Sequence, residues 1–452
     1  MRCDPMALVS RNAVTSVGAV LTSTDSNRLN DVNHIFMNSV KKKELKATNQ
    51  GHSGRCWMYA GLNVFRHAII NGMGIDNFEF SETYLFFYDK LERADSFLRW
   101  HMDHLDRKPG DRDFEFVITN TLQDGGWWHM FVGLVKKYGL IPKDAMKETY
   151  HSGDSEDMNS IIVEKLHGAV HWMRRNRKAD HEEKREAVLE DVHRLLTLFL
   201  GEPPKKFRWS FTTDEGESTI IEGLTPMSFK DLVFSSFDLD DFVSIANLPS
   251  KQLKMNQKYE VVETHNIVGD DDLTFLNMPI EELVRAARKS VVAGLPVWFS
   301  ADVRRYFHPW HSTLDNNLID FEPIFGQVEK NYDKGARVDY QTTAGCHAMT
   351  LTGVNTRKNN APVNWQVENS WGYVDNEEPG MDGWLSMSHS WFQEYVTEVV
   401  VHKSFLSRRV QKLWQQAPIR LKPWEFAAPA AAIRAGCVDA PHEWRNRVDG
   451  KK

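Results

Sequence analysis

Cysteine is scarce in this 452-residue chain, which has only four, at positions 3, 56, 346 and 437. They lie far apart, and no two of them form a C-x-x-C pair. This distribution excludes the dense disulfide framework of small secreted domains. It also excludes the closely spaced thiolates of a structural zinc site.

Long apolar runs are absent as well, since no stretch approaches the roughly 20 residues that span a bilayer. The N-terminus has no continuous apolar segment after a basic start, which argues against a secretory signal. Its Ser/Thr-rich first two dozen residues resemble a transit peptide only weakly, and Asp4 counts against one. We therefore expect a soluble, cytoplasmic protein with no membrane partner.

An excess of basic residues is also missing, because 55 Lys and Arg residues face 62 Asp and Glu residues, for a formal net charge of -7. This balance does not support nucleic acid as the main partner, although it leaves room for a local basic patch. Hydrophobic residues make up 41% and charged residues 26%, as in an ordinary soluble globular protein. The length suggests two or three domains.

The periodicity changes from helical to strand-like along the chain. Helices are expected at about 57–70, 81–99, 130–138 and 154–200, and short strands at about 348–354, 364–368 and 398–401. Asn71-Gly72 is a plausible stop for the first of these helices. Helices followed by strands indicate the α+β class.

Cys56 lies at the start of a predicted buried helix, directly after the turn-forming segment 50–55 (QGHSGR). Free N–H groups at a helix N-terminus favour negative charge, and the thiolate is the nucleophilic form of cysteine. Cys56 is therefore a candidate nucleophile, and Gln50 with the Cys56 N–H could form an oxyanion hole. The alternative is a small buried cysteine at a helix start.

A thiol nucleophile needs a base, and the base needs a group that holds its tautomer. His347 opens one predicted strand and Asn369 follows the next, so adjacent strands could bring the two side chains together. His347 would take the thiol proton while the Asn369 carboxamide accepts a hydrogen bond from the other ring nitrogen. Trp371 could cover that bond from water.

Gly125 and Gly126 precede the helix predicted from Met130 to Tyr138. A double glycine can expose backbone groups with which an extended peptide pairs, which makes both residues candidates for substrate binding. Such a pair often only forms a turn, so this pattern alone discriminates poorly.

The order of these motifs resembles the papain superfamily of cysteine peptidases. The matching residues are Gln50, Cys56-Trp57, His347-Ala348 and Asn369-Ser370-Trp371-Gly372. His347 follows Cys56 by 291 residues, against roughly 130–150 in ordinary papain-like enzymes, so large insertions are expected within the fold. The disulfide-forming cysteine of secreted members is missing before Cys56, which fits a reducing compartment.

Within that superfamily the chain resembles the bleomycin hydrolase family, known in bacteria as aminopeptidase C. The resemblance covers about residues 12–431 and rests on Ser53-Gly54-Arg55-Cys56-Trp57, on residues 136–143 (KKYGLIPK), and on Pro296-Val297-Trp298-Phe299 followed by Asp302. It implies a cytosolic cysteine aminopeptidase that removes N-terminal residues of peptides, and bleomycin-like amides, through a thioester. It also implies a homohexamer, and no metal or organic cofactor is expected.

By this resemblance Cys56 is the nucleophile, His347 the base, Asn369 its orienting group and Gln50 an oxyanion donor, while Gly125, Gly126 and Trp371 bind substrate. The implied fold is an α+β papain-like fold with a helical left part and a β-barrel-like right part, enlarged by helical and hook-like insertions. We expect a flexible arm at 1–25, the peptidase domain at 26–431 and an extension at 432–452. The domain would comprise a helical catalytic part at about 40–150, an inserted region at about 151–290, a β-rich catalytic part at about 291–405 and a C-terminal arm at about 406–431.

The C-terminus departs from the family pattern. The resemblance implies an arm whose terminal carboxylate receives the amino group of the substrate, yet this chain continues to Lys452, past the expected end near Ala431. The tail could be trimmed, it could leave the cleft while an acid such as Glu425 or Asp439 substitutes, or exo-specificity could be relaxed.

Two further interpretations stay open. Trp127 and His129 replace a smaller residue and an acid of the family pattern, which should alter the substrate pocket. The alternatives to an aminopeptidase are a cysteine endopeptidase or amide hydrolase with relaxed exo-specificity, and a catalytically silent oligomeric scaffold.

Overall fold

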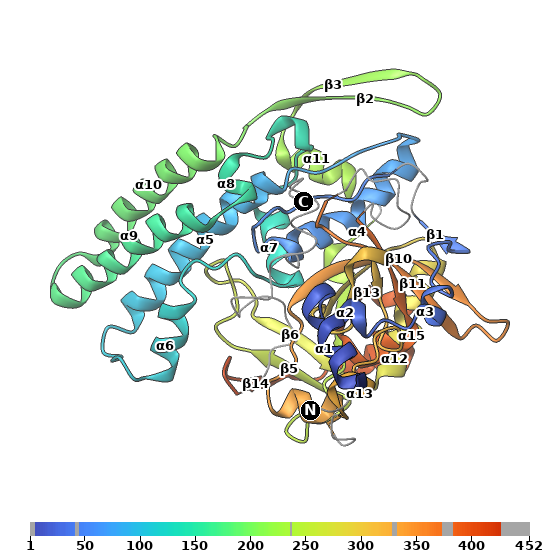
Figure 1. Ribbon diagram of the computed structural model, residues 1–452. Coiled ribbons are helices and arrows are strands. Elements are labelled where there is room, and N and C mark those ends of the chain that lie inside the picture. The colour runs from blue at the N-terminus through green and yellow to red at the C-terminus, as the bar shows by residue number, and fades with distance from the viewer. Residues whose placement is uncertain (1–4, 41–44, 236, 328–331, 373–382, 426–452) are drawn as a thin grey trace.

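The computed structural model describes residues 5–40, 45–235, 237–327, 332–372 and 383–425 (Figure 1). The expected extension at 432–452, with Asp439, lies outside the described residues. The α-helices are α1 (Pro5–Val17), α2 (Ala19–Thr22), α3 (Ser26–Leu29), α4 (Cys56–Met73), α5 (Glu82–Asp103), α6 (Arg112–Thr119), α7 (Trp128–Tyr138), α8 (Tyr150–Gly153), α9 (Glu156–Arg175), α10 (His181–Leu200), α11 (Pro226–Val233), α12 (Ile280–Val292), α13 (Glu322–Phe325), α14 (Lys334–Asp339), α15 (His389–Tyr395) and α16 (Arg408–Trp414).

The strands are β1 (Asn38–Ser39), β2 (Phe207–Thr212), β3 (Ser218–Leu224), β4 (Phe242–Ala246), β5 (Gln257–Val261), β6 (Leu273–Asn277), β7 (Val297–Ala301), β8 (Phe307–His308), β9 (Thr313–Leu314), β10 (His347–Thr356), β11 (Pro362–Glu368), β12 (Trp384–Ser388), β13 (Val396–His402) and β14 (Ile419–Leu421). All but β2 and β3 belong to one mixed sheet, in the order β14-β5-β6-β4-β13-β7-β10-β11-β12-β9-β8, with β1 beside β10. The chain is thus a mixed protein of helices and one large sheet.

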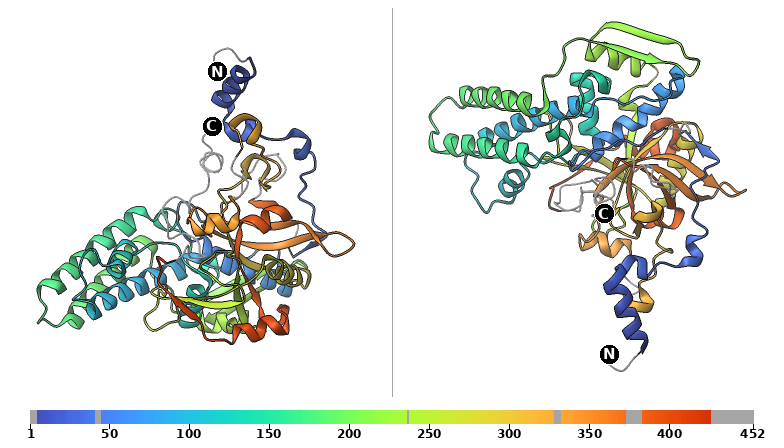
Figure 2. Two further views of the ribbon diagram at one scale, coloured as in Figure 1. Left: turned by 90° about the horizontal axis from the view of Figure 1, so that it is seen from below. Right: turned by 45° about the horizontal axis from the view of Figure 1, so that its top comes forward.

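The long helices gather on one side of the molecule and the sheet on the other (Figure 1). Helices α5, α9 and α10 lie side by side, and the β2–β3 hairpin extends away from the sheet. The arm expected at 1–25 contains α1 and α2, and both views of Figure 2 show α1 projecting from the body. Among the described residues, no helix combines the length and apolar character needed to cross a membrane.

Local signals place the helices that matter most for the site. The Ser81 hydroxyl accepts a hydrogen bond from the Tyr84 N–H and caps the start of α5, inside the segment 81–99 that was expected to be helical. Helix α4 does not stop at Asn71-Gly72 but continues to Met73. Gly74 then ends it with φ 61°, a left-handed conformation that glycine adopts without strain.

The core has two parts, one among α4, α5 and α7 and one between the sheet and α12. Helix α4 joins them, because it packs on β10 and is almost completely buried. Buried charges pin this contact: Glu368, at the end of β11, accepts from Arg66 at 2.9 Å and lies 2.7 Å from the His67 ring of α4. All three side chains are at most 1% exposed.

This cluster generates a stability prediction. Glu368→Gln leaves Arg66 buried without its closest carboxylate, so we expect the free energy of unfolding to fall by about 3 kcal/mol in denaturant titrations. The control Glu222→Gln, on the exposed face of the β2–β3 hairpin, should stay within about 0.5 kcal/mol of the parent. Equal stability of both variants would contradict the role of Glu368.

Candidate active site

Cys56 is the first residue of α4, as the sequence predicted, and its side chain is completely buried. Arg55 is the N-cap and offers no side-chain cap to the first turn. The first turn of α4 thus has no side-chain cap, and the positive N-terminal end of a helix favours the thiolate. Cys56 and Cys346 are both buried thiols.

His347 and Asn369 meet at the ends of neighbouring strands β10 and β11. His347 Nε2 lies 2.7 Å from Asn369 Oδ1, and both side chains are fully buried. Because Oδ1 can only accept, Nε2 donates, and Nδ1 is left with its lone pair. Nδ1 is buried and has no hydrogen-bond partner in the part of the chain that the structure describes.

Burial also sets the charge of this ring. It lowers the pKa of His347 to about 4, while the hydrogen bond to Asn369 acts in the opposite direction. At neutral pH the imidazole is therefore neutral and able to accept a proton at Nδ1. Trp371 stacks on it with ring centroids 4.6 Å apart and planes 27° apart, and at 2% exposure it shields the His347–Asn369 bond.

Gln50 is held against the segment that follows Asn369. The Ser370 hydroxyl donates to Gln50 Oε1 at 2.6 Å, and the Gln50 N–H donates to the Ser370 carbonyl at 2.8 Å. The Gln50 amide nitrogen donates to the Ser53 carbonyl at 2.6 Å, which uses one of its two hydrogens. These contacts tie the loop before Cys56 to the segment directly after β11 that carries Asn369.

Thr350 and Ala60 join the other two elements of the site. The Thr350 hydroxyl, three residues after His347 on β10, donates to the Ala60 carbonyl, four residues after Cys56 on α4, at 3.1 Å. The bond aligns the starts of the helix and of the strand. Together with the Gln50–Ser370 contacts, it brings the helix start, the base and the oxyanion loop to one place.

Arg55 and Glu148 support this loop, and the sequence analysis missed their role. The Arg55 guanidinium donates to Glu148 Oε2 at 2.7 Å and Oε1 at 3.2 Å, and its Nε donates to the Ser53 hydroxyl at 2.8 Å. Arg55 is fully buried although it is next to Cys56. An arginine in a Gly/Ser turn is a weak signal, and its partner lies 93 residues away in the sequence.

Asp124 is the second residue that the sequence analysis missed. Its carboxylate accepts from the Gly54 N–H at 2.9 Å, from Lys90 at 2.6 Å, from Asn159 at 2.7 Å and from the Ser155 hydroxyl. Burial alone would raise the pKa of Asp124, but Lys90 and these donors hold it well below its usual range. Its carbonyl accepts from the Trp57 indole at 2.7 Å.

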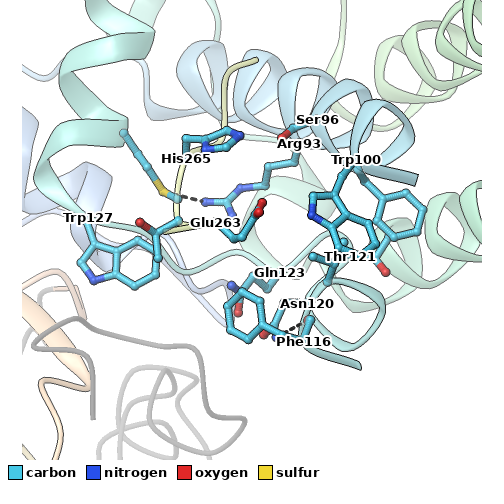
Figure 3. Close-up of a pocket in the computed structure, with 14 residues that line it drawn as sticks. Arg93, Ser96, Trp100, Phe116, Asn120, Thr121, Gln123, Trp127, Glu263 and His265 are labelled. Carbon is cyan, nitrogen blue, oxygen red and sulfur yellow. Dashed lines mark hydrogen bonds between the residues drawn. The ribbon is translucent and has the colours of Figure 1, made fainter. Parts of the chain in front are cut away.

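Gly125 and Gly126 therefore lie directly beside the start of α4. A Cβ added to Gly126 would come within 2.6 Å of the Trp57 ring, so the close approach requires glycine. The Gly125 carbonyl accepts from Arg93 at 2.6 Å. Trp127, expected to alter a substrate pocket, is 1% exposed and lines a cavity together with Arg93 and Glu263 (Figure 3).

No group of three or more His, Cys, Asp or Glu side chains is arranged to hold a metal ion within the ranges that the structure describes. The chemistry that the site offers is that of a thiol, a neutral imidazole and amide donors. These groups suit nucleophilic attack on a carbonyl carbon.

The glycine contact generates a prediction about turnover. Gly126→Ala forces the Trp57 ring or the backbone at residue 126 to move, so we expect hydrolysis of a peptide amide to fall about tenfold or more. Gly168→Ala is the matched control, because a Cβ at this position in α9 meets nothing within 4 Å. Steady-state kinetics on both variants checks this, and an unaffected Gly126→Ala protein would contradict it.

The contacts of Asp124 generate a second prediction. Asp124→Asn leaves Lys90 without its carboxylate and loosens the Gly54 loop, so alkylation of Cys56 at pH 6 should slow by about tenfold. Asp157→Asn, at an exposed position of α9, should leave the rate unchanged. Peptide mapping after timed alkylation measures both rates, and similar rates in the two variants would refute the positioning role of Asp124.

Comparison with known proteins identifies related peptidases. The model of the peptidase C1-like family matches residues 1–428. Aminopeptidase C of Listeria monocytogenes is 34% identical over 427 residues (94% of this chain and 95% of that protein), and human bleomycin hydrolase is 33% identical over 435 residues, with the same shares covered. The crystal structure of PepW from Lactobacillus rhamnosus superposes with a TM-score of 0.89 at 32% identity, over 95% of this chain and 96% of that one. The chain therefore belongs to the peptidase C1-like family, with relatives named aminopeptidase C and bleomycin hydrolase, as its motifs indicated.

Proposed function

We propose that this chain is a cysteine aminopeptidase that hydrolyses the N-terminal residues of peptides through a thioester on Cys56. The observation that carries the proposal is the buried His347–Asn369 bond, which leaves Nδ1 of a neutral imidazole as the proton acceptor. Membership of the peptidase C1-like family and relatives named aminopeptidase C and aminopeptidase G support it.

The reaction has two halves. His347 Nδ1 takes the proton of the Cys56 thiol, the sulfur attacks the substrate carbonyl carbon, and the C–N bond breaks as His347 returns the proton to the leaving amine. Water then attacks the thioester with His347 as the base. The C–S bond breaks, the carboxylic acid leaves, and the proton returns to the sulfur.

The other site residues act on charge and position. Gln50 Nε2–H and the Cys56 N–H stabilise the oxyanion in both halves, at the helix end where negative charge is favoured. Asn369 holds the tautomer of His347, and Trp371 excludes water from their bond. Gly125 and Gly126 offer backbone groups to which the substrate pairs as an added strand.

The proposal extends to the wider protein. Relatives named bleomycin hydrolase support bleomycin-like amides as further substrates of this chain. We also propose a cytoplasmic homohexamer built as a papain-like domain over 26–431, with the β-barrel-like part, the insertions and the boundaries expected from the sequence. The alternative of a cysteine endopeptidase or amide hydrolase rests on the extension after Ala431.

A mass-spectrometric digest tests this function. One peptide with a free N-terminus and its acetylated form are incubated with the full-length protein, with Cys56→Ala and with a version that ends at Ala431. We expect stepwise loss of single residues from the free peptide alone, and no cleavage by Cys56→Ala.

The other outcomes are also decisive. Cleavage of the acetylated peptide by the full-length protein would replace the aminopeptidase with the endopeptidase alternative. Absence of Cys56-dependent cleavage of either peptide would favour the silent scaffold. Single-residue loss only after truncation would mean that the extension blocks the site until it is removed.

A further inference from the structure

The cavity that Trp127 lines begins directly after Gly125-Gly126, the pair proposed to bind the substrate backbone. Its walls come from α5, α6, the residues before α7 and the segment that follows β5 (Figure 3). Aromatic rings form much of the wall, from Phe97, Trp100, Phe116 and Trp127. The cavity volume of about 70 Å³ holds only a few water-sized groups, so it fits the end of a side chain or an amino group.

The charges in this cavity do not balance. Arg93 is neutralised by Asp89, because its Nε lies 2.9 Å from both Asp89 oxygens. His265 is held by Asp272, whose Oδ1 lies 2.9 Å from Nδ1. The other polar side chains, on Ser96, Asn120, Thr121, Gln123 and Thr264, are uncharged. The remaining acid is Glu263, which forms no hydrogen bond or ion pair within the described ranges and interacts only at longer range with His265, already paired with Asp272.

The backbone of Glu263 supports a role other than folding. Glu263 has φ 61°, a left-handed conformation that costs a side-chain-bearing residue free energy and that Gly or Asn would adopt more readily. Strained conformations of this kind concentrate at functional sites. The backbone just before Glu263 is held in place, because the N–H of Val262 donates to the Leu421 carbonyl of β14 at 3.0 Å.

We infer that Glu263 and the aromatic walls around it form a subsite for an ammonium group of the substrate. A carboxylate that no hydrogen bond or ion pair occupies attracts a cation, and the faces of tryptophan and phenylalanine rings stabilise one further. Two parts of a peptide carry this chemistry: the free α-ammonium group and the side chain of a basic residue. The inference rests on the proposed peptidase function for its substrate and deepens it, since an acid at this place would distinguish a charged N-terminus from a blocked one.

Four peptide amides with a common leaving part test the subsite. They begin with leucine or lysine, each with a free or an acetylated N-terminus. Values of kcat and KM are measured for the parent protein, Glu263→Gln and Glu263→Asn. Glu260→Gln is the control, because Glu260 lies on β5 and pairs with Arg420 at 2.7 Å instead of lining the cavity.

The pattern of losses identifies the source of the ammonium group. If it is the α-ammonium, Glu263→Gln lowers kcat/KM about tenfold or more for both free peptides, mainly through KM, and leaves acetylated peptides unchanged. If it is the side chain, only the two lysine peptides lose. Equal kcat/KM of parent and variant on all four peptides would overturn the subsite.

Two measurements distinguish a substrate-binding role of Glu263 from a structural role, and a failure of this inference from a failure of the proposed peptidase function. Glu263→Asn should keep or raise the melting temperature while losing the charge preference, whereas a structural role predicts a lower one. If the parent cleaves no peptide, calorimetric titration of Cys56→Ala with the free lysine peptide replaces kinetics. Weaker binding after the additional change Glu263→Gln would support the subsite, and unchanged or undetectable binding in both would refute it.

Discussion

The packing of helix α4 on strand β10 is the constraint on which the site depends. The candidate nucleophile begins the helix, and the candidate base begins the strand, so their relation is set by how the two elements pack. Buried charge holds that packing, since Glu368 of β11 meets Arg66 and His67 of α4 with almost no exposure. Removing one partner from such a cluster is costly because the others remain desolvated.

Buried polar side chains next to the candidate site hold the groups that would touch a substrate in fixed positions. Arg55 and Glu148 fix the loop before Cys56, and Asp124 ties the same loop to Gly125-Gly126. Each is a charge-assisted contact with little solvent around it, where hydrogen bonds are strong and direction matters. The site is therefore held by contacts between parts of the chain that are distant in sequence.

His347 and Glu263 differ in their surroundings, and this difference gives the two residues different electrostatic properties. His347 is enclosed and therefore neutral, which suits a proton acceptor. Glu263 lines a cavity whose other charges are paired within the protein, which suits recognition of a cation. The first property concerns the chemical step and the second the choice of substrate, and the two are carried by different parts of the chain.

The sequence by itself determined the family, the helix that begins at Cys56, the strands after His347 and before Asn369, and a helix at the place of α5, because these depend on local spacing and motif order. It also suggested the residues that the structure joins into one network, since their types are dictated by the chemistry of a thiol nucleophile. Only the tertiary structure decided that α4 continues to Met73 and that Asp124, Arg55 and Glu148 support the site. It also decided that Glu263 lines a cavity without a hydrogen bond or ion pair among the described residues. These features depend on contacts between residues far apart in the sequence, and burial and pairing exist only after the chain has packed.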